Sequence, residues 1–201
     1  MNIKEKINNY LGNKSLFGKI SDLVFVVFII AMIFPSGRMA IGGAINRVKA
    51  MISQPEIDEN GEQMSDNDFN WLLTDINGNQ INLNEYKGKV VFINLWATWC
   101  PPCVGEMPEI QKLYKHFKNN DKVKFLMITS DPVSKIKKFI NKRSYTFPVY
   151  QYNSNPPIPF RVKSIPTTFI INKSGKIVIK KTGAANWGGS KTIKIIEKLL
   201  R

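Results

Sequence analysis

The chain has 201 residues, a mass of 22.9 kDa and a formal net charge of +14. This length suits one domain with an extension, and an apolar content of 43% excludes a chain that is disordered throughout. Two cysteines exclude a disulfide-dense secreted scaffold, and a single histidine excludes a histidine-rich metal site.

The excess positive charge is confined to the last third of the chain. Residues 1–66 and residues 67–131 each carry seven basic and seven acidic side chains, whereas residues 132–201 carry fifteen Lys or Arg and one acid, Glu197. A basic surface of this size suits nucleic acid, anionic lipid or an acidic partner. The alternative is a lysine-rich surface that only contacts solvent.

The N-terminal region contains an uncharged apolar run, LVFVVFIIAMIF, at residues 23–34. A full membrane span needs about 20 apolar residues and a signal-peptide core about 7–15, but no small-residue cleavage site follows the run directly. We expect residues 20–52 to form an uncleaved membrane anchor that continues into an amphipathic helix, with a cleaved signal sequence as the alternative. The lysines before the run favour a cytoplasmic segment at residues 1–19, and the remainder of the chain is then exported.

Residues 53–67 are polar and acidic and contain Pro55 and Gly61, which is typical of a linker. Residues 68–201 then predict a folded domain. Its first element is a β-hairpin, with strands at 69–74 and 80–83 around the tight-turn pair Asn77-Gly78.

The rest of the domain alternates apolar runs with helical patterns. Strands are expected at 90–96, 123–129, 167–171 and 176–180, and helices at 102–117, 133–142 and 191–200. Residues 151–160 are rich in proline and predict a loop. This order indicates an α/β fold with a mixed central sheet flanked by helices.

Both cysteines fall in one tetrapeptide, Cys100-Pro101-Pro102-Cys103, where a buried strand passes into a helix. The free N–H groups and dipole at a helix N-terminus favour a thiolate. Cys100, at the exposed N-terminal end of the helix, is expected to attack a substrate disulfide, and Cys103, one turn further in and more buried, to resolve the mixed disulfide.

Metal binding is the competing interpretation of this pair. Structural zinc needs four ligands, and His116 is the only histidine available. Copper(I) suits two soft thiolates, with help from Met107, so a copper-binding or copper-delivery protein is an alternative. A docking domain with a basic surface is another alternative.

The string Trp99-Cys-Pro-Pro-Cys-Val-Gly-Glu-Met-Pro108 resembles the active site of the TlpA/ResA-like branch of thioredoxin-fold proteins. These are membrane-anchored, extracytoplasmic thiol:disulfide oxidoreductases. The segment Ser164-Ile165-Pro166-Thr167-Thr168-Phe169 resembles the loop that carries the cis-proline of this family. The resemblance covers about residues 68–201 and implies a thioredoxin fold with an N-terminal hairpin addition.

The resemblance also implies roles for single residues. Pro166 is expected to follow a cis peptide bond opposite the cysteines, and Trp99, Pro101 and Ile165 are expected to join it in contacting the substrate. Glu106 matches the glutamate of this branch and is expected to exchange a proton with the resolving thiol. The alternative for Glu106 is a carboxylate favoured by the first turns of a helix.

The sequence thus predicts an enzyme that reduces disulfides of exported proteins, for example apocytochromes c. It would receive electrons from a membrane thiol donor. No cofactor beyond the Cys100–Cys103 disulfide, no metal and no nucleic acid is expected. The predicted location is the extracytoplasmic side of a bacterial inner membrane.

Overall fold

The computed structural model describes residues 15–34, 37, 53–152 and 154–201. Two compact units divide the chain, residues 1–42 and 43–201. In the first unit, helix α2 spans Leu16–Ile33, and Ser15 caps it by accepting a hydrogen bond from the Gly18 N–H. None of its side chains is buried. With 18 residues, the helix is long and apolar enough to cross a membrane. The predicted amphipathic helix at 38–52 and the segment 1–14 lie outside the described residues.

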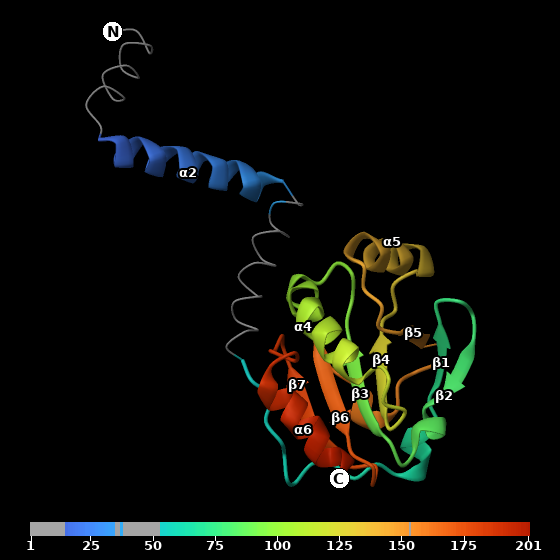
Figure 1. Ribbon diagram of the computed structural model, residues 1–201. Helices are drawn as coiled ribbons and strands as arrows, with labels where there is room; N and C mark the ends of the chain where they lie inside the picture. The colour runs from blue at the N-terminus through green and yellow to red at the C-terminus, as the bar shows by residue number, and fades with distance from the viewer. Residues whose placement is uncertain (1–14, 35–36, 38–52, 153) are drawn as a thin grey trace, which may run out of the picture. The chain divides into compact units, whose positions relative to one another are not determined.

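The second unit contains one seven-stranded mixed sheet with the order β2-β1-β5-β4-β3-β6-β7 (Figure 1). The strands are β1 Leu72–Asp75, β2 Gln80–Asn82, β3 Val90–Leu95, β4 Val123–Ile128, β5 Val149–Tyr152, β6 Thr167–Ile171 and β7 Ile177–Thr182. Strands β3, β4 and β5 are parallel neighbours, and the other pairs are antiparallel. The thioredoxin-type fold and the added hairpin are confirmed.

Among the described residues of this unit, three α-helices pack on the sheet: α4 at Pro101–Phe117, α5 at Val133–Arg143 and α6 at Ser190–Leu200. Helices α4 and α6 lie across the same face of the sheet (Figure 1). Alternate residues of the buried strand β3 supply the two apolar cores, since neighbouring side chains point to opposite faces. The first core includes residues of α4, α5 and α6. The second is completed by the short 3₁₀ turns η1 (Asp66–Phe69), η2 (Leu83–Tyr86) and η3 (Ile158–Phe160).

The sequence-based prediction missed strand β5, which pairs with both β1 and β4 and so joins the hairpin to the central sheet. This strand has only four residues and is followed by a proline-rich segment, so it has no local pattern that identifies it. The first strand, β1, also begins three residues later than predicted. Residues 66–69 form the turn η1, which Ser65 and Asp68 cap reciprocally.

Part of the segment 53–67, which the sequence predicts as a polar linker, pairs with the edge strand β7. The Asp58 N–H donates to the Val178 carbonyl at 2.8 Å, and the Ile177 N–H donates to the Glu62 carbonyl at 2.9 Å. Met64 is buried in the second core. The segment therefore satisfies backbone groups of the edge strand β7, and its polar composition reflects its solvent-facing side.

Candidate active site

The two cysteines lie at the start of α4. Cys100 is the N-cap residue, Pro101 and Pro102 occupy the first two helical positions, and a disulfide joins Cys100 to Cys103. The Cys103 N–H points at Cys100 Sγ, 3.3 Å away. Proline suits these positions because the first N–H groups of a helix have no partner within the helix. Both cysteines are buried, Cys103 completely and Cys100 with 4% of its surface exposed.

The proline loop lies opposite Cys100, as the resemblance implied. The Ile165–Pro166 peptide bond is cis, and the Ile165 carbonyl oxygen lies 3.8 Å from Cys100 Sγ. Trp99 stands beside the disulfide with 64% of its surface exposed. The fold thus brings Ile165 against Cys100, and Trp99 and Ile165 line one pocket. This arrangement leaves Cys100 as the sulfur nearest to an incoming chain.

Glu106 is fully buried within α4, one turn beyond Cys103. Three donors surround its carboxyl group. Asn94 Nδ2 donates to Oε1 at 2.8 Å, while Trp187 Nε1 at 2.8 Å and the Ala185 N–H at 3.1 Å donate to Oε2. Burial raises the pKa of Glu106 to about 7, and these hydrogen bonds oppose the rise by stabilising the ionised form. A buried carboxyl group with a pKa near neutrality is suited to take up or release a proton.

Asn94 connects Glu106 to the proline-loop strand. Its Nδ2 also donates to Thr168 Oγ1 at 2.8 Å, and Thr168 follows Pro166 by two residues. Its Oδ1 is buried without a hydrogen-bond partner among the described residues. An amide that turns by 180° would present this oxygen to a protonated Glu106, so the amide can serve either protonation state of the carboxyl group.

Two parts of this site were missed by sequence reasoning. Trp187 and Ala185 come from the segment between β7 and α6, about 80 residues after Glu106, and no local motif marks them. Asp131 was also missed. It is buried after β4, and its Oδ2 accepts a hydrogen bond from the Thr98 N–H at 2.6 Å, which holds the loop that precedes Cys100. The signal in the sequence was an acid directly before Pro132, shortly after an apolar run.

No group of three or more Cys, His, Asp or Glu side chains that could hold a metal ion occurs in the part of the chain that the structure describes. His116 lies on the outer side of α4, where its Nε2 is 3.8 Å from Glu197 Oε1. Met107 is buried in the first core. In the described structure, His116 is therefore not a third metal ligand beside the two cysteines.

Comparisons with known proteins agree with this geometry. A sequence profile of the AhpC/TSA family matches residues 64–180, more than half of the chain. The thiol-disulfide oxidoreductases ResA of Halalkalibacterium halodurans and of Bacillus subtilis are each 36% identical over 115 residues, or 57% of this chain. The matched regions cover 65% and 64% of those proteins, so this chain spans slightly less than two thirds of their length.

Among solved structures, StoA from Bacillus subtilis superposes with a TM-score of 0.52 at 25% identity, covering 65% of this chain and 96% of that one. The profile match includes the segment that carries the two cysteines, the buried glutamate and the proline loop. The chain therefore belongs to the AhpC/TSA family, and within the thioredoxin fold it is similar to the ResA thiol-disulfide oxidoreductases.

Proposed function

We propose that this protein is a thiol:disulfide oxidoreductase that reduces disulfides in exported proteins. The observation that carries the proposal is the Cys100–Cys103 disulfide at the N-terminus of α4, opposite the Ile165–Pro166 loop and one turn before the buried Glu106. Its ResA relatives are named thiol-disulfide oxidoreductases, which supports the same chemistry here.

The proposed cycle starts from the reduced dithiol. The Cys100 thiolate attacks one sulfur of a substrate disulfide and forms a mixed disulfide, and the other substrate sulfur leaves as a thiolate and takes up a proton. Cys103 then loses its proton and attacks Cys100 Sγ, which releases the second substrate sulfur and closes the Cys100–Cys103 disulfide. Two electrons pass from the protein to the substrate. The disulfide itself is the redox group, and no further cofactor enters the cycle.

Glu106 has the proposed role of exchanging a proton with the Cys103 thiol. It lies on the same face of α4 as Cys103, three residues further along the helix. A group whose pKa is about 7 can accept the proton from Cys103 when the mixed disulfide resolves, and can return it when the disulfide is reduced again.

We further propose that α2 anchors the protein in a bacterial inner membrane with the cysteine domain on the extracytoplasmic side. The length and apolar composition of α2 support this location. A membrane thiol donor would then reduce the disulfide, and exported proteins such as apocytochromes c would be substrates. Nucleic acid is not an expected partner outside the cytoplasm.

The proposal is tested by reduction of insulin disulfides with dithiothreitol as donor. The wild-type protein should accelerate insulin reduction, Cys100→Ser should abolish the acceleration, and Cys103→Ser should accumulate a mixed disulfide that mass spectrometry detects. Equal activity of the wild type and of a Cys100→Ser, Cys103→Ser double variant would overturn the proposal. Stoichiometric copper(I) binding without insulin reduction would support copper delivery instead.

The reduction potential of the Cys100–Cys103 pair tests the direction. Thioredoxin-like pairs extend from about −270 to about −120 mV. A value well below −200 mV agrees with a reductase. A value well above it contradicts the reductase direction and favours an oxidase or isomerase.

A further inference from the structure

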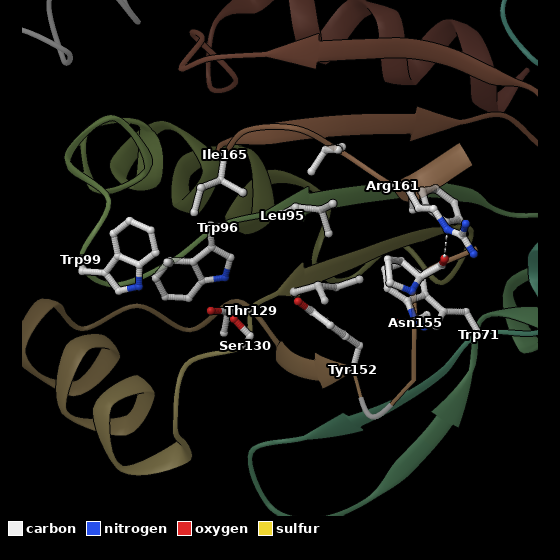
Figure 2. Close-up of a pocket in the computed structure, with 15 residues that line it drawn as sticks. Trp71, Leu95, Trp96, Trp99, Thr129, Ser130, Tyr152, Asn155, Arg161 and Ile165 are labelled. Atoms are coloured by element: carbon white, nitrogen blue, oxygen red, sulfur yellow. Dashed lines mark hydrogen bonds between the residues drawn. The ribbon is translucent and has the colours of Figure 1, made fainter. Parts of the chain in front are cut away.

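A pocket of about 470 Å³ opens beside the redox site on the described domain. Trp99 and Ile165, which flank Cys100, belong to its wall, so the pocket continues the surface that surrounds the disulfide. Figure 2 shows Trp99 at one end of the pocket and Arg161 with Asn155 at the other. Its size is within the range of about 300–1,000 Å³ that small-ligand sites occupy.

The base of the pocket is apolar and aromatic. Trp71 stacks on Phe160, with ring centroids 5.1 Å apart, and Leu95 and Ile128 come from the ends of the central strands β3 and β4. These side chains belong to the second core and are almost entirely buried. The base is therefore rigid, because it is part of the packed core and not of a loop.

Two hydrogen-bond donors in this apolar wall have no acceptor. The indole Nε1 atoms of Trp71 and Trp96 are buried and lack any partner among the described residues, although the two side chains are only 1% and 2% exposed. Figure 2 shows the nitrogen of Trp96 turned toward the interior of the pocket and away from Trp99. Buried tryptophan N–H groups usually find a partner, so these two donors point to a ligand that carries acceptor oxygens.

The far end of the pocket is positively charged. Arg161 is exposed, and its Nε donates to the Pro156 carbonyl at 3.1 Å, which fixes the guanidinium group at the rim. Lys163 is exposed two residues further on, and Lys180 Nζ lies 3.4 Å from the Pro159 carbonyl beneath the turn η3. The acid nearest in sequence to the lining residues Thr129 and Ser130 is Asp131. It is buried, and its Oδ2 accepts a hydrogen bond from the Thr98 N–H.

From this arrangement we propose that the pocket binds a segment of the substrate polypeptide beside its disulfide, with an aromatic side chain in the pocket and an acidic side chain at Arg161. The proposal rests on the proposed disulfide reductase function and adds a substrate class to it. A substrate sulfur that reaches Cys100 must pass between Trp99 and Ile165, and the adjoining residues then enter the pocket. Carbonyl oxygens of that segment would accept from the indole N–H groups of Trp71 and Trp96.

This assignment also accounts for part of the positive charge in residues 132–201. Arg161 lies at the end of the pocket where the acidic residue would lie, and opposite charges at the rim of an interface increase the association rate and specificity. An aromatic ring with a neighbouring carboxylate therefore matches both ends of the pocket, whereas a purely aliphatic ligand leaves the guanidinium group and both indole donors unused.

The test uses the reduced full-length protein in detergent and three synthetic peptides that share one intramolecular disulfide ring. Outside the ring they carry Trp-Glu, Trp-Lys or Ala-Glu. The second-order rate constant of disulfide exchange is measured for each peptide and divided by the rate constant for 2-hydroxyethyl disulfide, which is too small to reach the pocket. We expect the Trp-Glu peptide to react about tenfold faster than either other peptide, equivalent to about 1.4 kcal/mol.

The variants identify the side chains that produce this preference. Arg161→Gln should remove the preference for Glu over Lys, and Trp71→Phe, which keeps an aromatic ring but lacks the N–H, should reduce the relative rate for the Trp-Glu peptide about fivefold. The matched control is Lys118→Gln, which removes one exposed positive charge at the opposite end of α4. This variant should keep the full preference for the Trp-Glu peptide. Arg161 is exposed, so its variant remains informative if the Trp71 variant does not fold.

The outcomes separate the two proposals. A protein that does not react even with 2-hydroxyethyl disulfide contradicts the reductase function itself. A protein that reduces 2-hydroxyethyl disulfide but treats the three peptides equally overturns the pocket assignment and leaves the reductase function intact. A preference for Trp-Glu that persists in both Arg161→Gln and Trp71→Phe also overturns the assignment.

Discussion

Trp187 Nε1 donates a hydrogen bond to Glu106 Oε2 at 2.8 Å, although 81 residues separate the two side chains along the sequence. Both are completely buried. The bond joins the active-site helix α4 to the segment before α6, so the environment of the Glu106 carboxyl group depends on a distant part of the fold.

The first prediction concerns the pH dependence of stability. Because burial raises the folded-state pKa of Glu106 from 4.5 to about 7, its contribution to stability is complete below about pH 4.5 and is lost as the pH rises through about 7. Glu106→Gln removes this titration. We expect the free energy of unfolding of the wild type to fall by about 3 kcal/mol relative to the variant between pH 4.5 and pH 8.

Urea unfolding of both oxidised proteins at several pH values measures this difference. A Gln at position 106 fits the site, because the Asn94 amide can turn and accept a hydrogen bond from the new NH₂ group. A constant difference between wild type and variant across this pH range would contradict the raised pKa. Glu109→Gln, one turn of α4 further along, is the matched control.

The second prediction is for Trp187→Phe, which keeps a ring in the core but removes the donor to Glu106. The ionised carboxylate loses one of its three hydrogen bonds, so the pKa of Glu106 should rise further. The variant should therefore lose more stability at pH 8 than at pH 5, by about 1–3 kcal/mol. An infrared titration of the buried carboxyl C=O stretch gives an independent measurement. An unchanged titration midpoint would argue that Trp187 only fills space.

The third prediction concerns Asp131, whose carboxylate holds the Thr98 N–H in the loop before Cys100. Asp131→Ala leaves that N–H without its partner and should cost about 1–3 kcal/mol of stability, whereas Asp131→Asn keeps an acceptor and should recover most of the loss. Denaturant unfolding measures both variants, with the exposed Asp121→Ala as the control for loss of one negative charge. Equal stabilities of the Ala and Asn variants would show that the hydrogen bond to Thr98 contributes little.

The fourth prediction tests the packing of residues 53–65 on β7. Met64 is buried in the second core, so Met64→Ala should lower the free energy of unfolding by about 2–4 kcal/mol. Glu62 presents an exposed side chain while its carbonyl accepts from the Ile177 N–H, so Glu62→Ala should change stability by less than about 0.5 kcal/mol. A free linker would make both substitutions neutral.

Local patterns in the sequence were sufficient for much of the fold. The apolar run of β3, the helical period of α4 and the Asn77-Gly78 turn depend on residues close together in the chain, and the structure confirms these elements. The cysteine tetrapeptide and the proline loop were found in the same way, because each is a continuous motif. Strand β5 and the course of residues 53–65 were not found, since both are held by pairing with strands that are distant in sequence.

The sequence by itself determined the family, the redox pair and the position of Glu106 one helical turn from Cys103. Only the tertiary structure decided what surrounds that carboxyl group and what lies beside the disulfide. The three donors to Glu106 come from β3 and from the segment before α6, and the pocket joins Trp71, Trp96 and Arg161 from separate elements. Burial and hydrogen bonding depend on which distant segments pack together, and a local sequence pattern does not record this.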